Sequence, residues 1–174
     1  DLALMEAFAD ALIEKIFTVQ VEILSRFLDR SAGYMDLVFV SDDMGSQNGL
    51  MMSLEMWRKY FKNRLTRICE LIHSYDLKVF YHSDGAVEPL IPELIEAGID
   101  VLNPIQHICP GMDRQNLKEK FGDQLIFHGG VENQSVLPFG NTDDVREETL
   151  ECLQTLGKGM QGYICASCHR IQPG

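Results

Sequence analysis

The sequence predicts an α/β protein that comprises the C-terminal five or so βα units of a TIM-type (β/α)8 barrel with parallel strands. Two observations lead there: β-forming segments alternate strictly with helical ones, and every strand segment ends in polar residues. An open doubly wound sheet shares this alternation, but no Gly-x-Gly-x-x-Gly follows the first strand. Since a whole barrel has typically ~250 residues, we expect a single partial barrel domain over residues 1–174, with the N-terminal part of the full barrel missing.

The first part of the chain contains two predicted helices and one predicted strand. Apolar residues recur at helical spacing over residues 2–28, which indicates one long amphipathic helix. Residues 36–40 contain the apolar run LVFV, which is typical of a buried strand. Ser53 is a suitable N-cap with Glu55 in the first turn, so a second helix is expected from there to about Tyr75.

Residues 78–106 form one complete βαβ unit. A strand is predicted over 78–82, and Glu88-Pro89 opens a helix because proline is tolerated in the first turn. Gly98 ends that helix, and a second strand follows over 99–103. The two strands are expected to be parallel and joined by a right-handed crossover.

The C-terminal part repeats this pattern twice. Asp113 caps a short helix that Gly122 stops, and Asn141 or Thr142 caps a longer helix that ends at Gly157. A predicted strand follows each helix, the first over residues 124–128 and the second over residues 162–166.

The composition excludes several classes of function. An apolar fraction of 45% is sufficient for a sizeable core, whereas a net charge of −11 would repel a phosphate backbone, so nucleic acid is not an expected partner. No run of eighteen apolar residues and no basic leader are present, so we expect neither membrane insertion nor export, and we expect a cytoplasmic protein. Five scattered cysteines are expected to be reduced.

Polar residues at the ends of the predicted strands are the candidate site residues, because ligands bind at the carboxyl ends of parallel strands. His82 and Asp84, two residues apart, suit a metal-ligand pair, a base with its orienting acid, or a hydrogen-bonding clamp; the alternative is a loop histidine beside a turn-forming Asp-Gly. Further polar residues follow the other predicted strands: Asp42, Asp43, Asn103 and Gln106.

The last two strand ends carry histidine, glycine and cysteine. His128 precedes Gly129, where a glycine allows a ligand to approach the backbone, although a structural histidine is equally expected. For Glu132, a solvated loop carboxylate is the more expected interpretation and contact with a ligand is the alternative. Strand alternation points Cys165 into the packing and leaves Cys168 or His169 facing the mouth of the barrel, and the CxxC spacing is weak evidence for redox chemistry. His73, His107 and Cys109 are expected to be structural.

Five segments together resemble the uroporphyrinogen decarboxylase superfamily. They are the loop 42–50, the tetrapeptide HSDG at 82–85, LIPELIEAGIDVLNPIQ at 90–106, FHGGVE at 127–132 and SCHRIQPG at 167–174. The resemblance covers nearly the whole chain and corresponds to the C-terminal half or more of that family. It implies a (β/α)8 barrel, and a function either as a cofactor-free decarboxylase of porphyrinogen acetate side chains or as a zinc-dependent methyltransferase.

The resemblance to the methyltransferases implies a metal site. In those enzymes the segment that corresponds to HSDG has the sequence His-x-Cys-Gly, and a further cysteine near the last strand end completes their zinc site. Here Asp84 replaces the first cysteine and His169 stands near the second, so His82, Asp84 and His169 are the expected ligands of zinc or another divalent metal. Cys168 would be a metal ligand only if the correspondence between this segment and the family's cysteine shifts by one residue. A corrinoid carrier protein and a thiol acceptor would be the partners.

The resemblance to the decarboxylases implies catalysis by His169 without a metal or other cofactor. The substrate would be a tetrapyrrole, and the expected substrate-binding residues are Asp42, Asp43, Gln106, His128, Gly129 and Glu132. We expect this decarboxylase activity first and metal-dependent methyl transfer as the alternative. His82 and Asp84 are also expected to be catalytic residues. A third hypothesis is a non-catalytic module that binds a tetrapyrrole or a partner chain, or forms a homo-oligomer, through unpaired edge strands.

Overall fold

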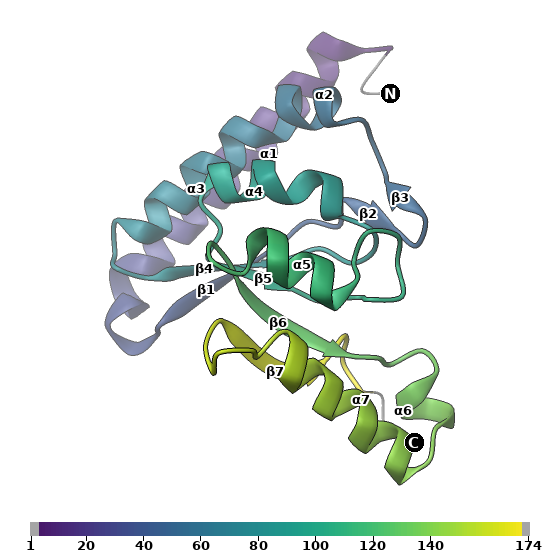
Figure 1. Cartoon of the computed structure of the whole chain (residues 1–174). Helices are drawn as coiled ribbons and strands as arrows, with labels where there is room; N and C mark the ends of the chain where they lie inside the picture. Colours follow the sequence, from purple (N-terminus) through teal and green to yellow (C-terminus); the bar gives the residue numbers. More distant parts are fainter. Residues whose placement is uncertain (1–3, 172–174) are drawn as a thin grey trace.

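A computed structural model of the chain describes residues 4–171 (Figure 1). Its main feature is a five-stranded parallel sheet in the order β1-β4-β5-β6-β7. The strands are β1 (Leu37–Ser41), β4 (Lys78–His82), β5 (Val101–Asn103), β6 (Ile126–Val131) and β7 (Tyr163–Ser167), and β2 (Gly45–Ser46) and β3 (Gly49–Leu50) form a separate antiparallel pair. The five predicted strands and the α/β class are confirmed, and consecutive order in one sheet is what part of a barrel requires.

The described helices alternate with these strands. They are α1 (Glu6–Ser31), η1 (Ala32–Tyr34), α2 (Leu54–Trp57), η2 (Arg58–Lys62), α3 (Asn63–His73), η3 (Glu88–Leu90), α4 (Ile91–Ala97), α5 (Arg114–Phe121), α6 (Val136–Phe139) and α7 (Thr142–Thr155). The predicted helix from Ser53 is one continuous path through α2, the π-helical turn η2 and α3. The sequence did not predict α6, and the expected start of the first helix at residue 2 lies outside the described residues.

The predicted helix ends are confirmed where a side chain caps them. Ser53 Oγ accepts from the Met56 N–H at 3.1 Å, and Asp113 Oδ1 accepts from the Asn116 N–H at 2.9 Å. Asn141 forms a capping box at the start of α7, and Gly98 ends α4 with a φ of 103° that favours glycine. These local signals fix where each helix meets its strand.

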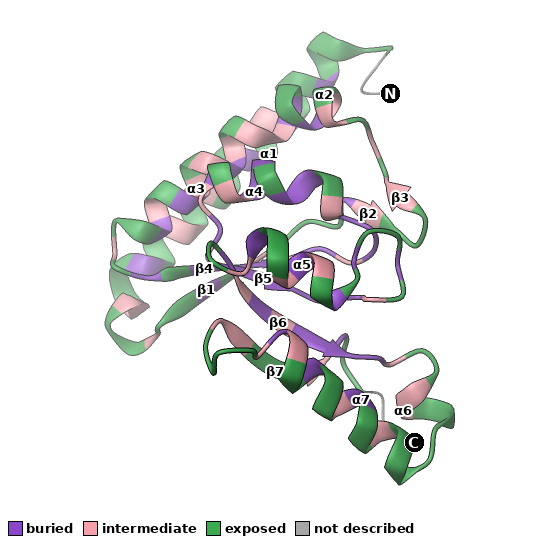
Figure 2. Cartoon of the chain, viewed as in Figure 1, coloured by how far each residue is buried: buried purple, intermediate pink, exposed green. Residues whose placement is uncertain are grey.

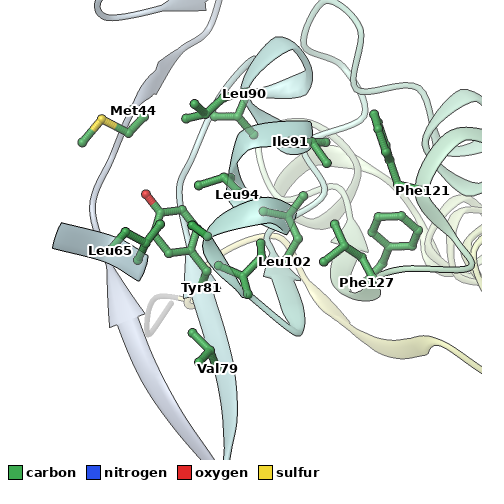
Figure 3. Packing of buried hydrophobic residues seen from close by; sticks show 14 of the residues in the cluster. Met44, Leu65, Val79, Tyr81, Leu90, Ile91, Leu94, Leu102, Phe121 and Phe127 are labelled. Carbon is green, nitrogen blue, oxygen red and sulfur yellow. The ribbon is translucent and has the colours of Figure 1, made fainter. Parts of the chain in front are cut away.

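The core lies between the sheet and the helices (Figures 2 and 3). Val79 and Tyr81 on β4 are buried in it, together with Leu94 of α4 and Leu102 of β5 (Figure 3). Because side chains alternate along a strand, Phe80 and His82 lie on the opposite face of the sheet. That second face carries the polar strand ends.

The long helix predicted at the start of the chain is confirmed as α1, but little of it is buried. Only Ala9, Phe17 and Leu28 are buried in α1, and Figure 2 shows most of the helix as exposed. Several large apolar side chains of α1 are exposed: Phe8, Leu12, Ile16, Val19, Ile23 and Phe27. Leu37 and Phe39 on β1 are exposed as well. Both elements lie at the sheet edge, where no further strand covers them.

Another correction concerns β6, which continues past the predicted end at His128 to Val131. Gly129 pairs with Cys165 and Gly130 with Ala166 in the register with β7. These pairings place both glycines in the strand and not in the loop, and their φ values of 93° and 101° are ones that glycine adopts without strain.

No helix in the described part of the chain has the length and apolar character needed to cross a membrane.

Candidate functional site

His82, Asp84 and His169 lie together at the carboxyl ends of β4 and β7. One potential ligand atom from each residue lies within 4.8 Å of the other two. The His82 and His169 rings have centroids 6.2 Å apart and an angle of 62° between their planes. His82 and Asp84 are partly buried and His169 is exposed. The three side chains that the sequence assigned to a metal site are therefore close enough to contact one ion.

The HSDG turn is held in place by hydrogen bonds on both sides. Ser83 Oγ accepts from the Met44 N–H at 2.9 Å, and the Ser83 N–H donates to the Asn103 carbonyl at 2.9 Å. The next N–H, of Asp84, donates to Asp43 Oδ1 at 3.1 Å. Gly85 has a φ of 87°, and a Cβ there would lie 2.5 Å from the Ser46 carbonyl oxygen, so only glycine fits this turn.

Two carboxylates surround the outer nitrogen of His82. Its Nε2 lies 3.8 Å from Asp84 Oδ2 and 3.7 Å from Asp43 Oδ1. Asp84 Oδ1 is buried and has no hydrogen-bond partner among the described residues. A buried oxygen of this kind costs free energy unless a donor or a cation satisfies it. The donor set of two imidazoles and one carboxylate, with an unsatisfied oxygen, therefore fits a divalent metal.

Asn103 connects this cluster to His128. The register pairs His82 of β4 with Asn103 of β5, and Leu102 with Phe127 of β6, which sets Asn103 beside His128. Asn103 Oδ1 lies 2.6 Å from His82 Nδ1, and Asn103 Nδ2 lies 2.8 Å from His128 Nδ1. Burial lowers the pKa of His128 below its ordinary value. The sequence placed Asn103 at a strand end but gave no signal for this bridge, because it depends on strand register.

Aromatic rings line the same face of the sheet. Phe39 and Phe80 stack with centroids 5.6 Å apart, and Phe80 meets the His128 ring edge-on at 4.9 Å. Phe39 also lies 5.7 Å from the His82 ring. The polar cluster is thus bordered by apolar rings that can contact an organic ligand.

Of the predicted substrate-binding residues, Gln106 and Gly129 are part of the structure around the HSDG turn and β6, and Asp42 lines a cavity next to α1. Gln106 is buried, and its Oε1 accepts from the Gly85 N–H at 2.5 Å, so it supports the HSDG turn. Gly129 lies inside β6 beside Asn103 Nδ2, 3.5 Å from where its Cβ would be. Asp42 lines a cavity of about 460 Å³ between α1, α3 and β1. Burial of its carboxyl and the charge of Asp43 raise its pKa to about 6.

The expectation that Glu132 is a solvated loop carboxylate is wrong. Glu132 is buried, and its carboxylate accepts from the backbone N–H groups of Gln134, Ser135 and Val136 and from the Ser135 hydroxyl. Burial opposes its ionisation, but these hydrogen bonds outweigh burial and keep its pKa below the ordinary value. Glu132 therefore fixes the start of α6.

The expectation that Cys165 points into the packing is also wrong, and of the two alternatives, Cys168 and His169, the cysteine is not the one that faces the site. Cys165 is exposed, whereas Cys168 is buried with its Sγ 3.2 Å from the Ile105 carbonyl oxygen. Burial raises the pKa of the Cys168 thiol to about 12, so the thiolate that a metal needs is disfavoured. His169 is the residue of this segment that reaches the cluster.

The histidines expected to be structural are held by carboxylates away from the cluster. His73 Nε2 lies 2.8 Å from Asp100 Oδ2, and His107 Nε2 lies 3.0 Å from Glu148 Oε1. Glu148 also accepts from the buried Arg114, and Cys109 is buried in the core. His73, His107 and Cys109 therefore lie outside the cluster of His82, Asp84 and His169.

Comparison with known proteins found a matching family model and a similar solved structure. The family model described as uroporphyrinogen decarboxylase matches residues 3–174, and a search of curated proteins found no match. Among solved structures, a methyltransferase from Methanosarcina mazei is similar, with a TM-score of 0.58 and 20% sequence identity. The match covers 90% of this chain and 47% of that chain, so the present chain spans about half the length of that methyltransferase.

At 20% identity the solved structure supports the shared fold alone. The family model carries the assignment further, because it covers almost the entire sequence, and the HSDG, FHGGVE and SCHR segments meet at one edge of the sheet. The chain belongs to the uroporphyrinogen decarboxylase family.

Proposed function

We propose that His82, Asp84 and His169 bind one divalent cation and that the protein is a metal-dependent methyltransferase of this family. The observation that carries the proposal is the approach of three ligand atoms to within 4.8 Å of one another, from two segments far apart in sequence. The unsatisfied buried Asp84 Oδ1 supports it independently, because a cation would compensate that oxygen.

The donor set indicates what the site would do. Three protein ligands leave a position open for a ligand from solution, as in catalytic zinc sites. When bound, the cation would lower the pKa of a coordinated thiol, so that the thiolate sulfur is available to accept a methyl group. The methyl donor we propose is a corrinoid held by a carrier protein. His82 and Asp84 would fix the cation, while Phe39 and Phe80 would contact the apolar part of the acceptor.

Metal titration of the full chain tests this proposal. We expect one zinc ion per chain, measured by calorimetry, and a large loss of affinity in His82→Ala, Asp84→Asn and His169→Ala variants. His73→Ala is the matched control, since His73 also lies beside a carboxylate but outside the cluster. Binding that is equally weak in the wild type and in all four variants would refute the proposal.

A substitution of the carboxylate tests the donor set itself. Asp84→Cys replaces a hard oxygen by a soft sulfur, so the ratio of zinc affinity to manganese affinity should rise. An unchanged ratio would place the ion somewhere other than at residue 84.

A second candidate is decarboxylation of a porphyrinogen acetate. The observation in its favour is Asp42, whose pKa of about 6 suits a proton donor near neutral pH. His169, exposed at the same end of the sheet, would face the substrate. The test is CO2 release from uroporphyrinogen by the full-length, chelator-treated protein, and activity that survives His82→Ala would favour this candidate over methyl transfer.

A further inference from the structure

Asn103 lies between His82 and His128, with a different end of its amide toward each ring. Its Oδ1 is 2.6 Å from His82 Nδ1, and its Nδ2 is 2.8 Å from His128 Nδ1. Asn103 is buried, and the sheet register holds all three side chains on one face of β4, β5 and β6. The strand register therefore keeps the three side chains next to one another.

The two ends of an amide impose opposite requirements. A carbonyl oxygen only accepts hydrogen bonds and an NH2 group only donates them. His82 must therefore carry its hydrogen on Nδ1, whereas His128 must present a bare Nδ1. A neutral imidazole has a single N–H, so His82 keeps a lone pair on Nε2 and His128 keeps its hydrogen on Nε2.

We propose that Asn103 is a positioning residue that locks His82 and His128 in opposite tautomers. The inference rests on the proposed function in one respect: the His82 tautomer that Asn103 selects is the one that can give its Nε2 lone pair to a cation. Metal-bound histidines usually donate their other N–H to a carboxylate or carbonyl oxygen, and Asn103 Oδ1 is such an acceptor.

The consequence for His128 is a specificity for oxygen acceptors. Because the Asn103 NH2 group takes the lone pair on Nδ1, the ring in this arrangement is neutral and Nε2–H is its one donor, and burial favours the same neutral form by lowering the pKa of His128. The residue can then donate a hydrogen bond to a carboxylate or carbonyl oxygen of a ligand, but it cannot accept one. Asn103 thus sets a lone pair at one end of the site and a hydrogen-bond donor at the other.

The tautomers can be measured directly in the full chain by 15N NMR of the imidazole nitrogens without metal. In alkaline buffer, above the ordinary histidine pKa of about 6.5, we expect a protonated Nδ1 in His82 and a protonated Nε2 in His128. His82→Gln and His128→Gln spectra assign the signals. Equal tautomers in the two rings, or the reverse pair that a flipped amide would give, would overturn the proposal.

Substitution of Asn103 separates its two ends. Asn103→Asp offers an acceptor to both histidines, so His128 must move its hydrogen to Nδ1 while His82 remains unchanged. His73, held by Asp100 away from this network, is the internal reference, and its signals should not move. A His128 tautomer that stays the same in Asn103→Asp would contradict the proposal.

Zinc affinity gives the second readout. Asn103→Ala removes the acceptor for His82 and should lower affinity roughly 10–100-fold, as loss of such partners typically does. Asn103→Asp should retain or exceed the wild-type affinity, because a carboxylate partner makes the ring more basic. Equal losses in both variants would indicate a merely structural role. If opposite tautomers are found but zinc does not bind, the proposed function fails and the role of Asn103 stands.

Discussion

Gln106 Oε1 accepts a 2.5 Å hydrogen bond from the backbone N–H of Gly85, and both residues are buried. This bond connects the loop after β5 to the turn that carries His82 and Asp84. Gln106→Leu would leave the Gly85 N–H unsatisfied at a cost of about 1–3 kcal/mol. We expect a lower urea midpoint and weaker zinc binding. Gln154→Leu on the exposed side of α7 is the control, and an equal loss there would contradict the argument.

The capping role of Glu132 predicts a local loss of stability on truncation. Glu132→Ala removes the acceptor for three backbone N–H groups at the start of α6, and we expect a loss of about 1–2 kcal/mol, as for other N-terminal caps. Because the folded-state pKa of Glu132 is lowered, its contribution is present above the ordinary pKa of 4.5 and is lost as the pH falls through the lowered value. Urea unfolding at several pH values measures both effects, with exposed Glu147→Ala as the control.

The buried pair of Arg114 and Glu148 gives a prediction of larger size. Glu148→Gln leaves the buried Arg114 guanidinium without its buried charged partner and should cost about 3–5 kcal/mol. Glu151 contacts the same guanidinium at 3.1 Å but is exposed, so Glu151→Gln should cost at most about 1 kcal/mol. Chemical unfolding of both variants compares them. Similar losses in the two would show that burial is not the deciding factor.

The raised pKa of Asp42 predicts a pH dependence of stability opposite in sign to that of Glu132. Its folded pKa is raised from 3.8 to about 6, so the folded state binds more protons than the unfolded state between these values, and stability falls as the pH rises through them. Asp42→Asn should therefore be more stable than the wild type at neutral pH, and the difference should disappear on acidification. Thermal unfolding across this range is the measurement, and Asp123→Asn, an exposed acid, should show no such trend.

The fold could be predicted because its signals are local. Ser53, Asp113 and Asn141 bond to N–H groups two or three residues away, so a short sequence window contains each cap and its partner. The strand pattern placed His82, Asp84 and His169 at one edge of the sheet, and the resemblance to the family supplied their grouping as one metal site.

The remaining features depend on contacts that no short window contains. Cys168 is turned inward because its N–H donates to the Val131 carbonyl at 2.8 Å, one strand away. Asn103 acquires its two histidines from the register of β4, β5 and β6. The apolar side chains of α1 are exposed because the sheet ends at β1 and no further strand of the described chain covers them. Helical periodicity in the sequence does not show whether another element covers a helix.

His82 is the last residue of β4 and Asp84 lies just after it, whereas His169 follows β7, and almost half of the chain lies between Asp84 and His169. A cation held by all three would act as a removable cross-link across a long loop, and its binding free energy would add to the free energy of unfolding. The midpoint of thermal unfolding would then rise with the logarithm of cation concentration. In such a chain the metal content of the buffer would set resistance to heat and to proteolysis, independently of any turnover.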